Sequence, residues 1–367
     1  MKKFELKNYE EQLNHQVIHM DQAVCYCPEF RASRMMHDYP SRRLQLARAV
    51  WKGEMPLSDY IGEINFRSIL SRQGERWQNF RENAEDCTDV TILCRQMLLE
   101  KGYQAPETEA FRKAVQAKDP LLFPEVTWEI PADSASKTKF LLDENTALCA
   151  KEYGRNVAEW LAKKQITTSN AVKAEYLGFE YFACGLVEEG TEHLKQLIEA
   201  YGADGTEKVI VLSAKAAYLL TTFAEKLDLK PAFEVVYLPE LLDVMEETER
   251  TYVYGGSFLL RYLNGADLLN RLIPAETEEK VPSSQEFTPY LKGKKRANEL
   301  TIWQKPVGAE YQLFAADQKL QESVLSDACA DIKRADAEKI LVFEPTALKA
   351  LQEQFPEKKV VYWLQEI

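Results

Sequence analysis

The sequence predicts an α/β protein in which a helical N-terminal domain is followed by two α/β domains with parallel sheets. Three observations lead to this fold class. Residues 1–115 show helical patterns and no convincing strand, later residues alternate short apolar runs with helical segments, and one strand–helix–strand pattern occurs twice. Short apolar runs that alternate with helices are typical of strands buried on both faces of a parallel sheet.

Three helices are expected in the N-terminal domain, at residues 41–52, 57–71 and 90–101. Within the first, Leu44, Ala47 and Trp51 recur at helical spacing and line one apolar face. Gly53 and Gly102 directly follow the first and third helices, where glycine commonly ends a helix.

Four prolines lie between residues 105 and 135, where only one short helix is expected, at 108–117. Such proline-rich stretches are typical of connections. We therefore expect a helical domain at residues 1–115 and a linker at 116–135. Strands are then expected at residues 139–143, 209–212 and 233–237, and helices at 153–164 and 214–226.

An internal repeat divides the rest of the chain. The segment Glu207–Leu212 matches Glu338–Phe343, each is followed by a helical segment, and each helix is followed by Val-Val-Tyr, at 235–237 and 360–362. Two copies of this length indicate a duplicated α/β domain rather than a solenoid. We expect the two domains at 136–248 and 249–367, facing each other about a pseudo-twofold axis.

Composition narrows the class of function. The net charge is -12 and the pI is about 5.1, with no obvious basic stripe, which argues against nucleic-acid binding. The charged first eleven residues lack the apolar core of a signal peptide, and no apolar run is long enough to span a membrane. Seven cysteines, an odd number, do not suggest a disulfide framework. We expect a cytoplasmic protein with reduced thiols.

Three cysteine-bearing segments carry a family resemblance: Cys27-Pro28, Cys87 with the residues after it, and Ala183-Cys184-Gly185. With the order of domains, they resemble the iron–sulfur subunits of the heterodisulfide reductase family. The iron–sulfur subunits of glycolate oxidase and of anaerobic glycerol-3-phosphate dehydrogenase share this layout. The resemblance implies a ferredoxin-like N-terminal domain with two 4Fe–4S clusters bound by C-x2-C-x2-C-x3-C-P runs. It also implies two Rossmann-like domains, each with a Cys-Cys-Gly (CCG) motif.

Most of the family's cysteines are replaced in this chain. In the N-terminal runs, the positions before Cys27 and Cys87 hold Val17, Met20, Ala23, Trp77, Phe80 and Asn83. In the first α/β domain, Asp143–Asn145 takes the place of the cysteine at a strand end and Ser213–Ala216 that of C-x2-C. In the second, Gly256, Pro306–Gly308 and Glu344–Ala347 stand at the corresponding places.

A 4Fe–4S cluster needs four ligands, normally cysteine thiolates, and each run retains one. We therefore expect no cofactor, with Cys27, Cys87 and Cys184 as vestigial ligand positions. Glu188 and Glu189 are expected to oppose a low pKa at Cys184, which favours a packed, structural thiol. The resulting hypothesis is a non-catalytic accessory subunit, a pseudoenzyme that docks a flavoprotein or an intact iron–sulfur paralogue, or pairs as a homodimer.

Two alternatives stay open. The chain could transfer electrons through a 4Fe–4S cluster completed by unrecognised ligands or by a partner's thiols. It could instead bind a small molecule in the cleft between the two α/β domains, where the ends of parallel strands meet.

Other motifs have simpler interpretations. His15, His19, Cys25 and Cys27 offer zinc-type ligands, but their spacing matches no standard finger, and a helix surface followed by a turn is expected. Gly202–Gly205 and Tyr254–Gly256 lack a full phosphate-loop pattern and are interpreted as turns. His37 and His193 are isolated and are expected at surface or packing positions.

Overall fold

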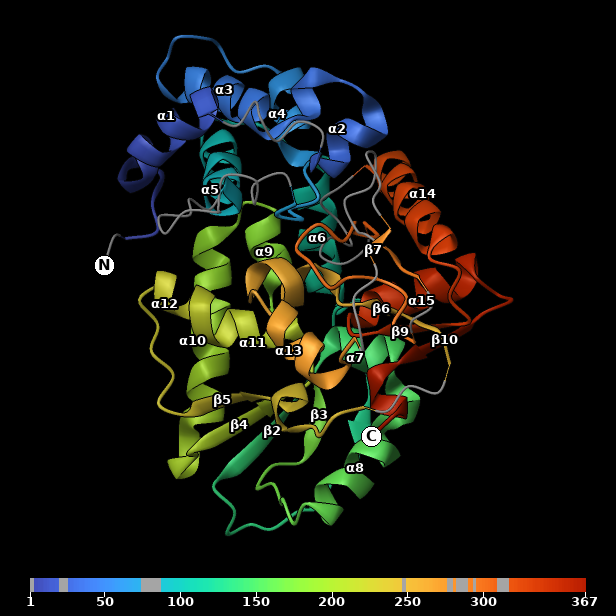
Figure 1. Cartoon of the computed structure of the whole chain (residues 1–367). Helices are drawn as coiled ribbons and strands as arrows, with labels where there is room; N and C mark the ends of the chain where they lie inside the picture. The colour runs from blue at the N-terminus through green and yellow to red at the C-terminus, as the bar shows by residue number, and fades with distance from the viewer. Residues whose placement is uncertain are drawn as a thin grey trace.

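The computed structural model describes residues 3–19, 26–73, 87–245, 249–275, 280–281, 290–292, 295–308 and 317–367. Within these residues the fold is mixed α/β and most strand pairs are parallel. A helical layer forms one end of the molecule, and two separate sheets lie beneath it (Figure 1). None of the helices in the described residues has the length and apolarity needed to cross a bilayer.

The described residues before Lys118 form helices, short turns and loops, without a strand. The helices are α1 (Glu10–His19), α2 (Pro28–Ser33), α3 (Pro40–Trp51), α4 (Asp59–Phe66), α5 (Cys87–Glu100) and α6 (Pro106–Ala117). The helices expected at 41–52 and 90–101 are thus confirmed as α3 and α5. Gly53 and Gly102 follow them with φ of 73° and 99°, the left-handed conformation of a helix end.

The helix α4 is shorter than the expected 57–71. Its start is set by Ser58, whose hydroxyl accepts a hydrogen bond from the Ile61 amide. It ends at Phe66, and the chain then turns through Leu70 and Arg72, which have positive φ. Helical periodicity alone did not reveal this turn.

The first sheet has five strands, in the order β1-β3-β2-β4-β5. They are β1 (Thr127–Trp128), β2 (Thr138–Asp143), β3 (Val172–Glu175), β4 (Lys208–Val211) and β5 (Glu234–Tyr237). Its helices are α7 (Glu144–Cys149), α8 (Gly154–Lys163), α9 (Phe179–Ala183), α10 (Val187–Gly202), α11 (Ala214–Tyr218) and α12 (Ala224–Lys226). The expected strands are confirmed as β2, β4 and β5. The linker also contains β1, which pairs antiparallel with β3.

The second sheet has three parallel strands, in the order β10-β9-β6. They are β6 (Thr251–Tyr254), β9 (Lys339–Val342) and β10 (Lys359–Tyr362), with helices α13 (Ala266–Leu272), α14 (Gln318–Arg334) and α15 (Pro345–Gln354). Two short strands, β7 (Lys280–Val281) and β8 (Tyr290–Leu291), form a separate antiparallel pair.

The two sheets share a local plan. Lys208 lies opposite Thr138 and Glu234 in the first sheet, and Lys339 lies opposite Thr251 and Lys359 in the second. An asparagine side chain bonds both backbone groups of one residue in each sheet: Asn170 bonds Phe140, and Asn298 bonds Val253. The asparagine pairs place Phe140 and Val253 at the same register position.

Helices from the two sheets pack reciprocally. The helix α7, which follows β2, packs against α15, which follows β9. The π-helical turn Phe258–Tyr262, which follows β6, packs against α11, which follows β4. The carboxyl ends of the strands in both sheets are therefore turned toward a shared interior.

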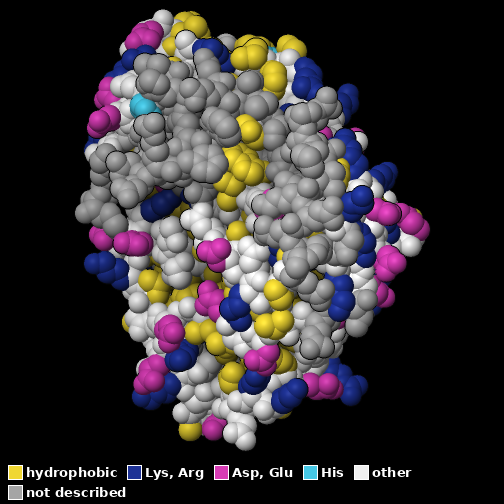
Figure 2. Space-filling view, viewed as in Figure 1, with side chains coloured by type: hydrophobic (Ala, Val, Ile, Leu, Met, Phe, Trp, Pro, Cys, Tyr) yellow, Lys and Arg dark blue, Asp and Glu magenta, His cyan; other side chains and the backbone are white. Residues whose placement is uncertain are grey.

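One hydrophobic core includes buried residues from the N-terminal helices and from both sheets. The domain division at residues 115, 135 and 248 accordingly stays a prediction. On the face shown in Figure 2, acidic and basic side chains are interspersed over the lower part, and no basic stripe crosses the described residues there.

Candidate functional site

Cys27 is held as a protonated thiol in the helical layer. It stands immediately before α2 and is 1% exposed. Its Sγ donates to Glu29 Oε2 at 3.1 Å and lies 3.6 Å from the carbonyl oxygen of Asp38. Burial raises the pKa of Cys27 well above its ordinary value, and the Glu29 carboxylate adds to this, while Arg43 opposes it.

Arg43 acts electrostatically on two of the predicted ligand positions, Cys27 and Cys87. Its guanidinium is buried and lies 3.7 Å from Glu29, whose carboxylate accepts hydrogen bonds from Ser68 Oγ and the Ile69 amide. Burial would lower the pKa of Arg43, but Glu29, Cys27, Asp38 and Cys87 raise it, and the net shift is upward. The charge of Arg43 therefore acts on both Cys27 and Cys87.

Cys184 lies apart from this pair, between α9 and α10, and is fully buried. Next to it, the Arg95 guanidinium donates to the carbonyl oxygen of Ala183. Burial raises the pKa of Cys184, and Arg95 only partly offsets it. The carboxylates that raise this pKa are Glu180 and Glu107, rather than the Glu188 and Glu189 expected from proximity in sequence.

A buried ionic triad occupies the carboxyl ends of β2 and β4. Lys215 Nζ forms an ion pair with Glu144 and lies 3.7 Å from Glu180 Oε1, and their side chains are at most 3% exposed. The other oxygen of Glu144 accepts a hydrogen bond from the Leu177 amide at 3.0 Å. We refer to Lys215, Glu144 and Glu180 as the ionic triad.

The triad holds two carboxylates around one ammonium. Burial raises the pKa of Glu144 to about 7, and the neighbouring Glu180 and Asp143 act in the same direction against Lys215. Burial opposes the charge on Lys215, but the two glutamates raise its pKa and hold it protonated. Lys215 therefore keeps its positive charge, and Glu144 is the group whose raised pKa allows it to bind a proton.

Sequence reasoning named two of these segments but missed the side chains that meet. Glu144 follows Asp143, and Lys215 lies within Ser213–Ala216, so the fold brings together two segments that the resemblance places at cysteine positions. Glu180 comes from α9, four residues before Cys184. The available signal was a charged residue within four positions after each of the two buried strands.

The second sheet has a different set of groups at its strand ends. Gly256 follows β6 with φ of 76°, and a Cβ there would lie 2.5 Å from the Glu344 side chain. Glu344 and Tyr362 from this sheet, together with Asp143 and Tyr237 from the first sheet, are at most 3% exposed. Burial raises the pKa of Tyr237, and Glu344 and Asp143 add to it, which places these groups near one another. Buried side chains from both sheets thus gather at these strand ends.

Several predicted positions lie outside the described residues, namely Met20, Ala23, Cys25, Trp77, Phe80 and Asn83, and the side chain of His19 is likewise not described. Val17 is half-buried and packs against the core. His37 contacts the Tyr60 hydroxyl at 3.0 Å, and His193 Nε2 lies 2.8 Å from the carbonyl oxygen of Tyr176. In the described part of the chain, no three His, Cys, Asp or Glu side chains are placed to share a metal ion.

The described thiols do not fit a 4Fe–4S cluster. Cluster ligands are thiolates, whereas burial raises the pKa of both Cys27 and Cys184, and the Cys27 thiol is hydrogen-bonded to a carboxylate. The first α/β unit has an ionic triad where the resemblance predicts ligands. No chemical step through a cluster follows from these residues.

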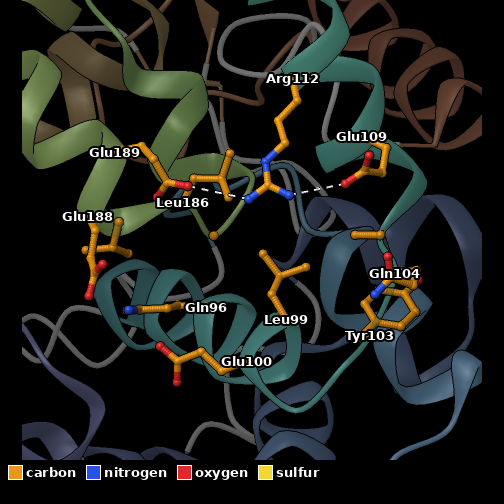
Figure 3. A pocket seen from close by; sticks show the side chains of 13 residues that line it. Gln96, Leu99, Glu100, Tyr103, Gln104, Glu109, Arg112, Leu186, Glu188 and Glu189 are labelled. Carbon is orange, nitrogen blue, oxygen red and sulfur yellow. Dashed lines mark hydrogen bonds and ion pairs between the residues drawn. The ribbon is translucent and has the colours of Figure 1, made fainter.

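A hollow of about 470 Å³ opens beyond Gly185, between α5, α6 and the start of α10 (Figure 3). Arg112 reaches into it from α6 and bridges Glu109 and Glu189, at 3.2 and 3.4 Å. Residues from the helical layer and from the first α/β unit line this hollow.

Comparison with protein-family models, with curated proteins and with solved structures gave no match to this chain.

Proposed function

We propose that this chain is a cluster-less, non-catalytic accessory subunit related to heterodisulfide-reductase-type oxidoreductases. In this role it docks a redox partner, either a flavoprotein or an intact iron–sulfur paralogue. The observation that carries the proposal is the ionic triad, because Lys215, Glu144 and Glu180 converge where the resemblance puts the cluster ligands of the first α/β unit.

The proposal includes a duplicated architecture, with two Rossmann-like domains after a ferredoxin-like helical domain. The matching registers of the two sheets support a duplication, as do the equivalent asparagines Asn170 and Asn298. The reciprocal packing of α7 on α15 and of α11 on the Phe258–Tyr262 turn is what a pseudo-twofold axis would produce.

Buried ion pairs in place of ligands favour a scaffold over an electron carrier. A buried ion pair is not a strong source of stability, but it fixes how the surrounding segments meet. Arg43 and Arg95 act similarly, since Arg43 donates from a buried position to the carbonyl oxygen of Asp38, and Arg95 to several backbone carbonyl oxygens. The scaffold is thereby maintained without an inorganic centre, which leaves its surface as the part available for function.

The test is a determination of iron and acid-labile sulfide on anaerobically purified full-length protein. We expect colourless protein without stoichiometric iron that co-purifies with an oxidoreductase subunit. About four irons per chain would refute the proposal.

A second measurement addresses a cluster shared with the partner. Iron in the captured complex should be the same for the wild type and for a Cys27→Ala, Cys87→Ala, Cys184→Ala variant of matched thermal stability. Loss of iron in the variant would show that these thiols hold a cluster at the subunit boundary, and would also refute the proposal.

A further inference from the structure

Two adjoining hollows form one groove on the side of the molecule where the helical layer meets α10. The first, of about 470 Å³, lies between α5, α6 and the start of α10. The second, of about 320 Å³, lies between the residues Lys3–Glu5, the start of α10 and the end of α12. Gln96, Val187 and Glu188 line both hollows, so the two adjoin. We call this the acidic groove.

The groove has apolar surface along its length. Leu99, Tyr103 and Leu186 line the first hollow, and Phe4 and Leu227 line the second. In Figure 3, Leu99 projects from α5 toward Arg112 across the hollow. A ligand that follows the groove can therefore bury apolar groups in both hollows.

The rim is strongly acidic. Besides the Lys3–Glu5 pair, it carries two basic residues, Arg112 and Lys226, and the acidic residues Glu100, Glu109, Glu188, Glu189, Glu192 and Asp228. Both basic residues are already ion-paired, Arg112 with Glu109 and Glu189, and Lys226 with Asp89. Glu100 and Glu188 form no ion pair within 4 Å in the described part of the chain.

Arg112 shows how the groove receives a cation. Its guanidinium lies between a carboxylate from α6 and one from α10, with the apolar Leu99 facing it (Figure 3). On the other side of the hollow, Glu100 from α5 and Glu188 from α10 flank Gln96. This pair repeats the arrangement of two carboxylates from two elements. Lys3, which is ion-paired with Glu5, acts electrostatically on Glu188 but forms no ion pair with it within 4 Å.

We infer that the acidic groove binds a basic, extended segment of a partner protein, in which Lys or Arg side chains alternate with apolar ones. This inference rests on the proposed docking function and names the chemistry of the partner. Charge complementarity selects the cationic side chains, with Glu100 and Glu188 as their first contacts. The apolar surface in both hollows selects a peptide over a small polyamine, which has no side chains to bury.

The experiment measures fluorescence anisotropy of a short labelled peptide in which Lys and Arg alternate with Leu, titrated with the full-length protein. We expect saturable binding that weakens steeply with salt, because the contacts are exposed ion pairs. The Glu100→Gln, Glu188→Gln variant should bind at least about tenfold more weakly, the loss of about 1.4 kcal/mol that two rim ion pairs provide. A peptide with Glu in place of Lys and Arg should not bind.

A Glu159→Gln, Glu353→Gln variant is the matched control, because it removes the same charge from exposed positions on α8 and α15. Equal weakening in both variants would reduce the effect to bulk charge and overturn the inference. Absence of peptide binding, or binding of spermine at the groove without binding of the peptide, would also overturn it. None of these outcomes bears on the iron determination, so the docking function and the groove are tested separately.

Discussion

Replacing Lys215 by Met tests the ionic triad most directly. The substitution keeps an unbranched chain of similar length but removes the ammonium that pairs with Glu144 and faces Glu180, whose side chains are at most 3% exposed. Removing one partner of a buried ion pair costs about 3–5 kcal/mol, because the remaining charge is left uncompensated. We expect a loss of stability in this range near neutral pH.

The loss should depend on pH, with a sign that follows from proton binding. Without Lys215, Glu144, whose ordinary pKa is 4.5, must stay protonated in the folded protein even above pH 7, where it is charged in the wild type. Holding a carboxyl protonated costs about 1.4 kcal/mol for each pH unit above its unfolded pKa. In the wild type Glu144 is already protonated at pH 5.5, below its pKa of about 7, so this effect adds little to the deficit of the variant there; at pH 8, one unit above that pKa, it adds about 1.4 kcal/mol. Stability relative to the wild type should therefore fall as pH rises through this window.

Chemical denaturation at both pH values is the assay. A Lys215→Met, Glu144→Gln variant removes a carboxylate together with the ammonium, so the excess pH dependence should largely disappear. Lys163→Met, at an exposed position on α8, is the matched control and should stay within about 0.5 kcal/mol of the wild type. A Lys215→Met protein as stable as the wild type at pH 8, or one whose deficit does not shrink at pH 5.5, would refute the reasoning.

Three further predictions concern the helical layer and its contact with the first α/β unit. Because burial raises their pKa, Cys27 and Cys184 should be alkylated by iodoacetamide at least about tenfold more slowly in the native protein than after denaturation, as followed by peptide mass mapping; equal rates would contradict this. Arg95→Lys should cost about 2–4 kcal/mol in denaturation experiments, because lysine cannot reproduce the fork that serves several backbone carbonyl oxygens; a neutral effect would count against that role. Gly185→Ala should destabilise the protein by at least about 2 kcal/mol more than Gly205→Ala. Both glycines have positive φ, but only at 185 would the new Cβ approach backbone atoms, at 2.9 Å. Equal losses of stability would show that this close contact relaxes freely.

Much of the secondary structure could be predicted from local pattern. The helix α3 follows from the spacing of Leu44, Ala47 and Trp51, and glycines mark the ends of α3 and α5. The strands β2, β4 and β5 follow from short buried runs. The strand β1 could not be predicted, since two residues in a proline-containing connector become a strand only by pairing with β3. Similarly, α4 ends early at a turn that periodicity does not reveal.

The candidate site, like the fold, could be predicted only in part from local sequence. By itself, the sequence determined how many thiols stand at the predicted cluster positions and that two strand–helix–strand units follow one another, because residue identity and short-range periodicity are local properties. Only the tertiary structure decided that Lys215 meets Glu144 and Glu180, and that the charge of Arg43 acts on both Cys27 and Cys87. These contacts form because parallel strands end at one edge of a sheet and because helices that are distant in sequence pack together. They also depend on burial, which alone converts a surface-type lysine or glutamate into a buried ion pair.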